Sequence, residues 1–158
     1  MTEALQRLLE APVEAGTLPH TLGMVITPTG VAFEGHAGDT DAERCYRIAS
    51  MTKALTSAAV MQLVERERVG LDDPISRHMS IPTPRVLVGV APQPRFRPAA
   101  RVPTIRELLT HTAGYGYGVW NEALHDYFEQ SGFGSLGPPG QARLETPMVA
   151  DPGTAWHY

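Results

Sequence analysis

Residues 47–56 read Arg-Ile-Ala-Ser-Met-Thr-Lys-Ala-Leu-Thr, with Ser50 placed three positions before Lys53. Lys53 is the only lysine among the thirteen basic residues of the chain. Positions i and i+3 of an α-helix share a face, so a serine on the first turn holds its hydroxyl within reach of the lysine amine. Ser50 and Lys53 are therefore a candidate nucleophile and base.

The residues around this pair suit that chemistry. A serine hydroxyl is a poor nucleophile until a base takes its proton, and lysine acts as a base only in its neutral form. Residues 54–64 are almost all small or apolar, which predicts a helix whose first three turns are buried and whose last turn, at residues 65–68, is exposed to solvent. Burial favours a neutral amine, and the unpaired amides at a helix start favour a developing oxyanion. The structural alternatives are a Ser50 that only caps the helix and a solvated Lys53.

The sequence before this helix predicts a helix and a β-hairpin. Apolar residues recur at helical spacing within residues 3–15, and Gly16 ends the pattern. Residues 22–27 and 31–35 are β-rich runs separated by a Pro-Thr-Gly sequence that is typical of a tight reversal. We expect the helix to pack on this sheet.

The sequence after it predicts short helices separated by irregular connections. A proline at the first helical position predicts a short helix over residues 74–79. Residues 82–103 contain six prolines and predict a long irregular connection that holds at most one short strand. Thr104 and Glu107 have the spacing of a capping box, so a helix begins there, and a further helix is expected over residues 121–130.

The composition is that of an ordinary globular protein. Of 158 residues, 42% are apolar and 19% are charged, which allows one domain with a sizeable core. A net charge of −4 without clustered basic residues argues against a nucleic-acid partner. Cys45 is the single cysteine, which excludes an internal disulfide, and no secretory leader or membrane-spanning stretch is recognisable. These features predict a cytoplasmic protein that does not enter the membrane.

Two other patterns do not indicate ligand sites. The six histidines include no His-x-x-x-His pair, so neither a metal nor another cofactor is expected. His111 is expected to fix a helix end. Residues 114–118, Gly-Tyr-Gly-Tyr-Gly, lack the spacing of a phosphate loop and predict a mobile turn. Its aromatics and Trp120 either line an acyl pocket or dock a helix.

Four segments, in order along the chain, resemble the class C β-lactamases and their carboxylesterase relatives, the family VIII esterases. Residues 47–56 resemble the nucleophile segment, and residues 70–75, Gly-Leu-Asp-Asp-Pro-Ile, resemble the segment after its helix. Residues 108–114, Leu-Leu-Thr-His-Thr-Ala-Gly, resemble the family's most recognisable structural motif. Residues 152–158, Pro-Gly-Thr-Ala-Trp-His-Tyr, resemble the approach to its tyrosine motif. The resemblance runs from about residue 22 to residue 158.

The resemblance implies catalytic roles for three residues. Ser50 is the acylated nucleophile, Lys53 is its base partner, and Tyr158 is the phenol that passes a proton to the leaving group. The alternative for Tyr158 is an aromatic residue without a catalytic role. Which group removes the serine proton is disputed for serine and lysine enzymes in general.

The resemblance also implies the fold, α/β (α+β) of the β-lactamase/transpeptidase type, with helices packed on an antiparallel sheet plus a helical subdomain. Residues 1–158 would form the N-terminal part of this domain: 1–49 supply a helix and hairpin of the α/β region, and 50–158 supply the nucleophile helix and helical region. The family's Tyr-x-Asn asparagine, its Lys-Thr-Gly or His-x-Gly strand, its other oxyanion amide and most of its central sheet lie outside these residues. One hairpin cannot cover an apolar helix and leaves strand edges unpaired. We therefore expect a complementary polypeptide segment to complete the domain.

The expected activity is that of a serine hydrolase with an acyl-enzyme on Ser50. The simplest version is a carboxylesterase that acts on small esters once the domain is complete. A β-lactamase, a D-amino-acid peptidase or an acyltransferase uses the same acylation step and differs in what attacks second. A non-catalytic binding fragment is the alternative from another class. The expected partners are a small ester or amide substrate and the complementary segment.

Overall fold

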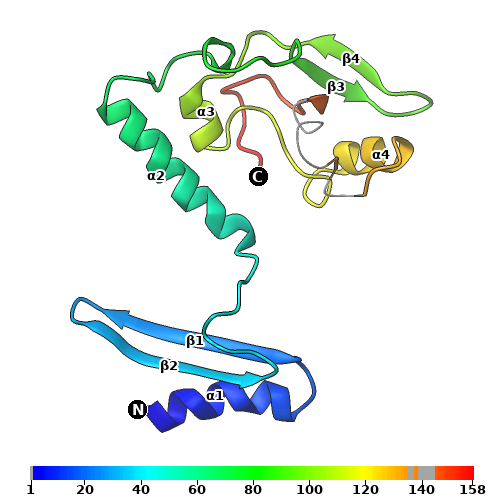
Figure 1. Cartoon of the computed structure of the whole chain (residues 1–158). Coiled ribbons are helices and arrows are strands. Elements are labelled where there is room, and N and C mark those ends of the chain that lie inside the picture. The colour runs from blue at the N-terminus through cyan, green and yellow to red at the C-terminus, as the bar shows by residue number, and fades with distance from the viewer. Residues whose placement is uncertain (1, 135–136, 139–144) are drawn as a thin grey trace. The chain divides into compact units, whose positions relative to one another are not determined.

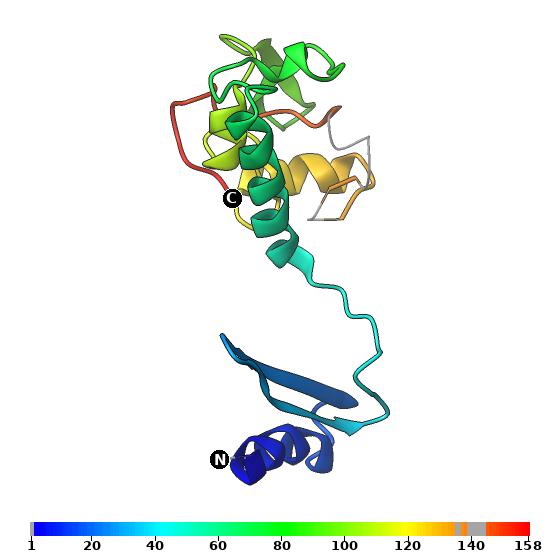
Figure 2. The ribbon, with the colours of Figure 1, turned by 60° about the vertical axis from the view of Figure 1, so that its left-hand side comes forward.

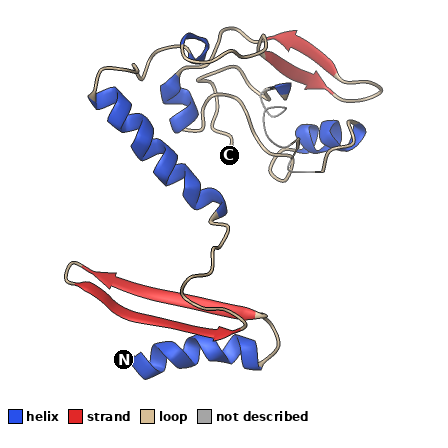
Figure 3. Cartoon of the chain, viewed as in Figure 1, coloured by secondary structure: helices blue, strands red, loops and turns tan. Residues whose placement is uncertain are grey.

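The computed structural model describes residues 2–134, 137–138 and 145–158. The chain forms two compact units, Met1–Ser50 and Met51–Tyr158. Figures 1 and 2 show the ribbon of each unit from two directions, and Figure 3 distinguishes its helices and strands. Within the described ranges, no helix is both long enough and apolar enough to cross a membrane.

The first unit is a helix on a two-stranded antiparallel sheet. Its elements are α1 (Thr2–Glu14), β1 (His20–Thr27) and β2 (Gly30–Gly38). The Gln6 amide nitrogen donates to the His36 carbonyl at 3.0 Å, and the Thr21 hydroxyl donates to the Leu9 carbonyl at 2.7 Å. The predicted helix and hairpin are thus confirmed, and α1 packs on the sheet as expected (Figure 3).

The hairpin carries exposed aliphatic side chains. Ile26 and Val31 lie opposite each other in the register and are 71% and 58% exposed. Among the described strands, β1 and β2 pair only with each other, so the outer edge of each strand is open. Open edges with apolar residues are surfaces on which further strands add readily. This agrees with the expectation that a single hairpin leaves strand edges unpaired.

The long helix α2 (Thr52–Glu65) directly follows a single 3-10 turn, η1 (Ala49–Met51). The helix itself was expected, but the prediction that its first three turns are buried is wrong. Leu55 is 65% exposed, and α2 contains no buried residue. Its apolar side chains surround the helix axis instead of forming one stripe, so contact on one side cannot cover them.

The second unit buries a small core between a second hairpin and a helix. Leu87 of the hairpin packs with Leu124 and Phe128, and Phe128 is fully buried. The unit continues after α2 with η2 (Ile75–Arg77), β3 (Arg85–Gly89), β4 (Arg95–Pro98), α3 (Ile105–Leu109) and α4 (Glu122–Gln130). In Figure 1, α4 lies beside the β3 and β4 pair.

The expectation of an irregular connection over residues 82–103 is wrong in one respect, because β3 and β4 pair as an antiparallel hairpin. Leu87 and Phe96 are partners in its register, and both pack into the core. The prolines of this segment fall before β3, between the strands, at the end of β4 or beyond it, where they do not interrupt the ladder. The short helix predicted at residues 74–79 is a single 3-10 turn, and the capping box and the helix α4 are confirmed.

Candidate active site

Ser50 and Lys53 lie on either side of the start of α2. Ser50 is exposed in the turn η1 and is the last residue of the first unit. Lys53 is half-buried in the first turn of α2 and belongs to the second unit. The N-cap position of α2 is occupied by Met51 without a side-chain hydrogen bond, so Ser50 is not the cap of this helix. The approach of the Ser50 hydroxyl to the Lys53 amine stays a prediction.

Lys53 and Tyr158 line one cavity of the second unit. The Lys53 Nζ lies 5.0 Å from the centre of the Tyr158 ring and 5.9 Å from that of Tyr117, close enough for cation–π attraction. The cavity has a volume of about 270 Å³ and is lined largely by apolar and aromatic side chains. Its lining residues are Lys53, Ile75, Met79, Leu108, His111, Tyr115, Gly116, Tyr117, Thr146 and Tyr158. Two of the predicted site residues are thus brought together from distant parts of the sequence.

Main-chain hydrogen bonds and ring contacts hold Tyr158 in place. The Tyr117 amide donates to the Tyr158 carbonyl at 3.2 Å, and the His157 amide donates to the His111 carbonyl at 2.9 Å. The His111 and Tyr158 ring centres are 4.9 Å apart, and the Trp156 indole stacks on Tyr158 at 6.2 Å. The glycine-rich turn and the last residues of the chain therefore lie side by side.

A salt bridge fixes the segment that leads to Tyr158. Glu107 is only 8% exposed, closes the capping box with Thr104 and accepts hydrogen bonds from Arg101 on both carboxylate oxygens. The Arg101 guanidinium also donates to the Pro152 carbonyl at 3.0 Å. The hydrogen bonds from Arg101 lower the pKa of Glu107 from 4.5 to about 2, although burial opposes this shift. One ionised carboxylate thus ties the start of α3 to Pro152.

Gly114 makes a second close contact with this segment. Its φ of 90° lies in the region that favours glycine. The Val149 amide donates to the Gly114 carbonyl at 2.8 Å, and a Cβ on Gly114 would overlap the Ala150 carbonyl oxygen. The glycine that ends the segment 108–114 is therefore required for the chain to pass this close.

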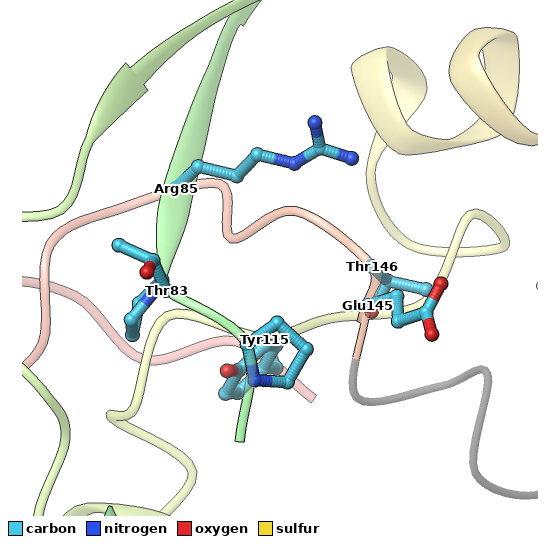
Figure 4. A pocket seen from close by; sticks show the side chains of 7 residues that line it. Thr83, Arg85, Tyr115, Glu145 and Thr146 are labelled. Atoms are coloured by element: carbon cyan, nitrogen blue, oxygen red, sulfur yellow. The ribbon is translucent and has the colours of Figure 1, made fainter.

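A more polar cavity of about 350 Å³ adjoins the first, because Tyr115 and Thr146 line both. Figure 4 shows Thr83, Arg85 and Glu145 among its other lining side chains. Burial raises the pKa of the Tyr115 phenol, so this hydroxyl stays neutral and available as a hydrogen-bond donor. The site therefore combines an apolar space beside Lys53 with a polar space beyond Tyr115.

Two of the histidines, His20 and His78, contact neighbouring side chains and line neither of the cavities described above. His78 pairs with Asp73 at 2.8 Å, and the His20 ring packs on Tyr46 with 5.6 Å between centres. Across residues 2–134, 137–138 and 145–158, no group of three or more His, Cys, Asp or Glu side chains is placed to hold a metal ion.

Sequence reasoning missed His111 as a residue of the Lys53 cavity, whereas Tyr115 and Tyr117, which were expected either to line an acyl pocket or to dock a helix, do line this cavity. His111 does end a helix, since its amide donates to the Leu108 carbonyl at 3.3 Å, yet its ring also contacts Tyr158. The two tyrosines belong to the turn that was expected to be mobile. The alternation of these tyrosines with glycine is the sequence pattern that indicates such a role, because glycine on each side leaves room for the aromatic rings to line a cavity.

Comparisons with known proteins agree on one family. A family model described as beta-lactamase matches residues 5–158. The acyltransferase mokF of Monascus pilosus is 36% identical over 116 residues, which cover 71% of this chain and 28% of that protein. The esterase EstB of Burkholderia gladioli is 30% identical over 121 residues, which cover 72% of this chain and 28% of that protein.

Solved structures show the same likeness. A mutant of simvastatin synthase from Aspergillus terreus is 28% identical, with a TM-score of 0.73 over 99% of this chain and 42% of that one. A D-stereospecific amidohydrolase from Streptomyces, at 24% identity and a TM-score of 0.62, shares the fold, and the match covers 100% of this chain and 45% of that one. The chain therefore spans less than half the length of these relatives.

Proposed function

Since the chain belongs to the β-lactamase family, we propose that it forms an acyl-enzyme on Ser50 from a small carboxylic ester and releases the acyl group to water. The observation that carries the proposal is the placement of Lys53 Nζ at 5.0 Å from the Tyr158 ring. These are the two acid–base groups that the chemistry needs besides the nucleophile. Both groups line one cavity whose walls are largely apolar and aromatic.

The proposed reaction has two balanced halves. In the first, the Ser50 hydroxyl loses its proton to the Lys53 and Tyr158 pair while its oxygen forms a bond to the ester carbonyl carbon. The bond to the alcohol oxygen then breaks, and the departing alcohol takes a proton from Tyr158. In the second half, water gives a proton to the pair as its oxygen forms a bond to the acyl carbon. The bond from that carbon to the Ser50 oxygen then breaks, the Ser50 oxygen takes the proton from the pair, and the carboxylic acid departs.

A second candidate differs only in the second half, where an alcohol replaces water and the product is a new ester. The names of several relatives favour it, among them the acyltransferase mokF and a monacolin J acid methylbutanoyltransferase from Aspergillus terreus that is 38% identical over 116 residues. Product analysis separates the two candidates. With p-nitrophenyl butyrate and a tenfold excess of an alcohol, a hydrolase yields butyrate and a transferase yields the ester of the added alcohol.

We further propose that turnover requires a complementary segment that carries the family's Lys-Thr-Gly or His-x-Gly strand. The open edges of β1 and β2 and the exposed apolar surface of α2 support this requirement. Such a segment would add strands to the first unit and cover apolar residues that the described elements leave in water.

The direct test is covalent labelling with a fluorophosphonate, read by mass spectrometry, with and without that segment. We expect one adduct on Ser50 of the assembled protein and none in Ser50→Ala. Ser57→Ala is the matched control, because Ser57 lies on the same helix and its loss should leave the label in place. An assembled protein that takes no label would overturn the proposal and support a non-catalytic binding role.

A further inference from the structure

We infer that a third cavity, which shares Tyr158 with the Lys53 cavity, binds the alcohol portion of the substrate and selects a small planar aromatic ring there. This inference rests on the proposed function, since it names the substrate class of the same site. The cavity has a volume of about 380 Å³ and adjoins the Lys53 cavity through two shared residues, Gly116 and Tyr158. It is lined by Gly116, Trp120, Asn121, Trp156, His157 and Tyr158.

The position of Tyr158 assigns this cavity to the alcohol. In the proposed reaction the phenol of Tyr158 gives its proton to the departing alcohol oxygen, so that oxygen must lie beside Tyr158. Lys53 lines only the first of the two cavities. The acyl carbon attacked by the nucleophile belongs near Lys53, and the group beyond the ester oxygen then extends past Tyr158 into the third cavity.

The lining favours an aromatic ring over an aliphatic one. Trp156 stacks on Tyr158 with 29° between the rings and meets the His111 ring edge-on at 6.1 Å, so its indole is held in one orientation. Trp120 is 74% exposed and Trp156 is 63% exposed, which leaves aromatic surface open to a ligand. Aromatic pairs gain more than their buried area alone provides.

The size and the polar groups of the cavity further define which ligands it can bind. The volume of about 380 Å³ lies near the lower end for ligand pockets and is sufficient for an aromatic ring. Asn121 caps α4 through its side-chain oxygen, which accepts from the Leu124 amide at 3.0 Å. Its amide nitrogen donates to no other residue that the structure describes, so it can donate to a polar substituent on the ring.

The chain offers a direct reporter, because its only two tryptophans are Trp120 and Trp156 and both line this cavity. The experiment titrates benzyl alcohol and cyclohexylmethanol, which match in size but differ in planarity, into Ser50→Ala protein while tryptophan emission is recorded. We expect benzyl alcohol to bind about threefold to tenfold more tightly, the range expected for aromatic stacking. Equal affinity for the two alcohols, or no change in emission with either, would overturn the inference.

Two variants assign the effect to this cavity. Trp120→Phe keeps an aromatic face and should keep most of the preference, read from the emission of Trp156. Trp120→Ala should abolish the preference and leave the fold intact, because Trp120 is highly exposed. A preference that survives Trp120→Ala unchanged would count against the assignment.

The same titration on the protein assembled with the complementary segment tests the competing explanation for the exposed indoles. If benzyl alcohol no longer binds after assembly, the segment fills the cavity and the inference is wrong. The outcome is separable from that of the proposed function. Binding without fluorophosphonate labelling would refute the acyl-enzyme and keep the cavity as an aryl site, whereas labelling without binding would refute only the cavity.

Discussion

Replacing Glu107 by glutamine tests the contact that holds the segment before Tyr158. Glutamine keeps the size of the side chain and can still complete the capping box with Thr104. It removes the charge that pairs with Arg101 and replaces one of the two oxygens that accept from the Arg101 guanidinium, which also reaches the Pro152 carbonyl. The substitution therefore breaks the two-point ionic contact and leaves the shape of the side chain.

The magnitude follows from the pKa of Glu107, which is lowered from 4.5 to about 2. At 1.36 kcal/mol for each pKa unit this corresponds to about 3 kcal/mol. The Arg101 side chain is 48% exposed, and solvent screening reduces the gain, so we expect Glu107→Gln to lower the free energy of unfolding by about 2 kcal/mol at pH 7.

The lowered pKa of Glu107 also determines how its contribution to the free energy of unfolding changes with pH. Because folding lowers the pKa of Glu107, its stabilisation is complete above the unfolded value near 4.5 and is lost as the pH falls toward about 2. Urea unfolding followed by circular dichroism should therefore show a gap between wild type and Glu107→Gln at pH 7 that closes between pH 4.5 and pH 2. A gap that is the same at both ends of this range would refute the reasoning.

Asp72→Asn is the matched control for that experiment. Asp72 also accepts two hydrogen bonds from one guanidinium, that of Arg106, at 2.8 and 2.9 Å. Its side chain is 75% exposed, against 11% for Glu107, so water replaces the lost contact at little cost. An effect of Asp72→Asn as large as that of Glu107→Gln would show that burial is not what strengthens the Glu107 pair.

Two further predictions concern the packing of the second unit. Gly114→Ala should destabilise the protein by more than about 2 kcal/mol, because backbone strain at φ 90° adds to a clash with the Ala150 carbonyl. The control Gly132→Ala, at φ 74° with open space around it, should cost about 1 kcal/mol. Equal losses of stability for the two variants in thermal unfolding would contradict this prediction. Phe128→Ala should cost about 3–5 kcal/mol because Phe128 is fully buried, and Phe133→Ala, at 38% exposure, should cost less than half of that in urea unfolding.

Local patterns in the sequence predicted local structure well and burial poorly. The capping box of Thr104 and Glu107 depends on residues three positions apart, and the hairpin β1–β2 depends on one short turn, so both follow from neighbours along the chain. The burial of α2 depends instead on what packs against it. An apolar sequence such as that around Leu55 indicates that the helix needs to be buried against other elements, but it does not show that these elements belong to the same chain.

The candidate site shows the same division between local and distant contacts. The spacing of Ser50 and Lys53 could be interpreted from one helical turn, whereas the contact between Lys53 and Tyr158 joins residues far apart in the sequence and was implied only by the resemblance to a family. In the structure that contact depends on two places where the segment before Tyr158 is held against the rest of the unit. One is the close contact with Gly114, and the other is the Glu107–Arg101 salt bridge to Pro152; together they keep the segment beside the Lys53 cavity. Substitutions at Glu107 should therefore change the geometry of Tyr158 as well as the stability, so a loss of stability in Glu107→Gln should be accompanied by slower acylation of Ser50 in the assembled protein.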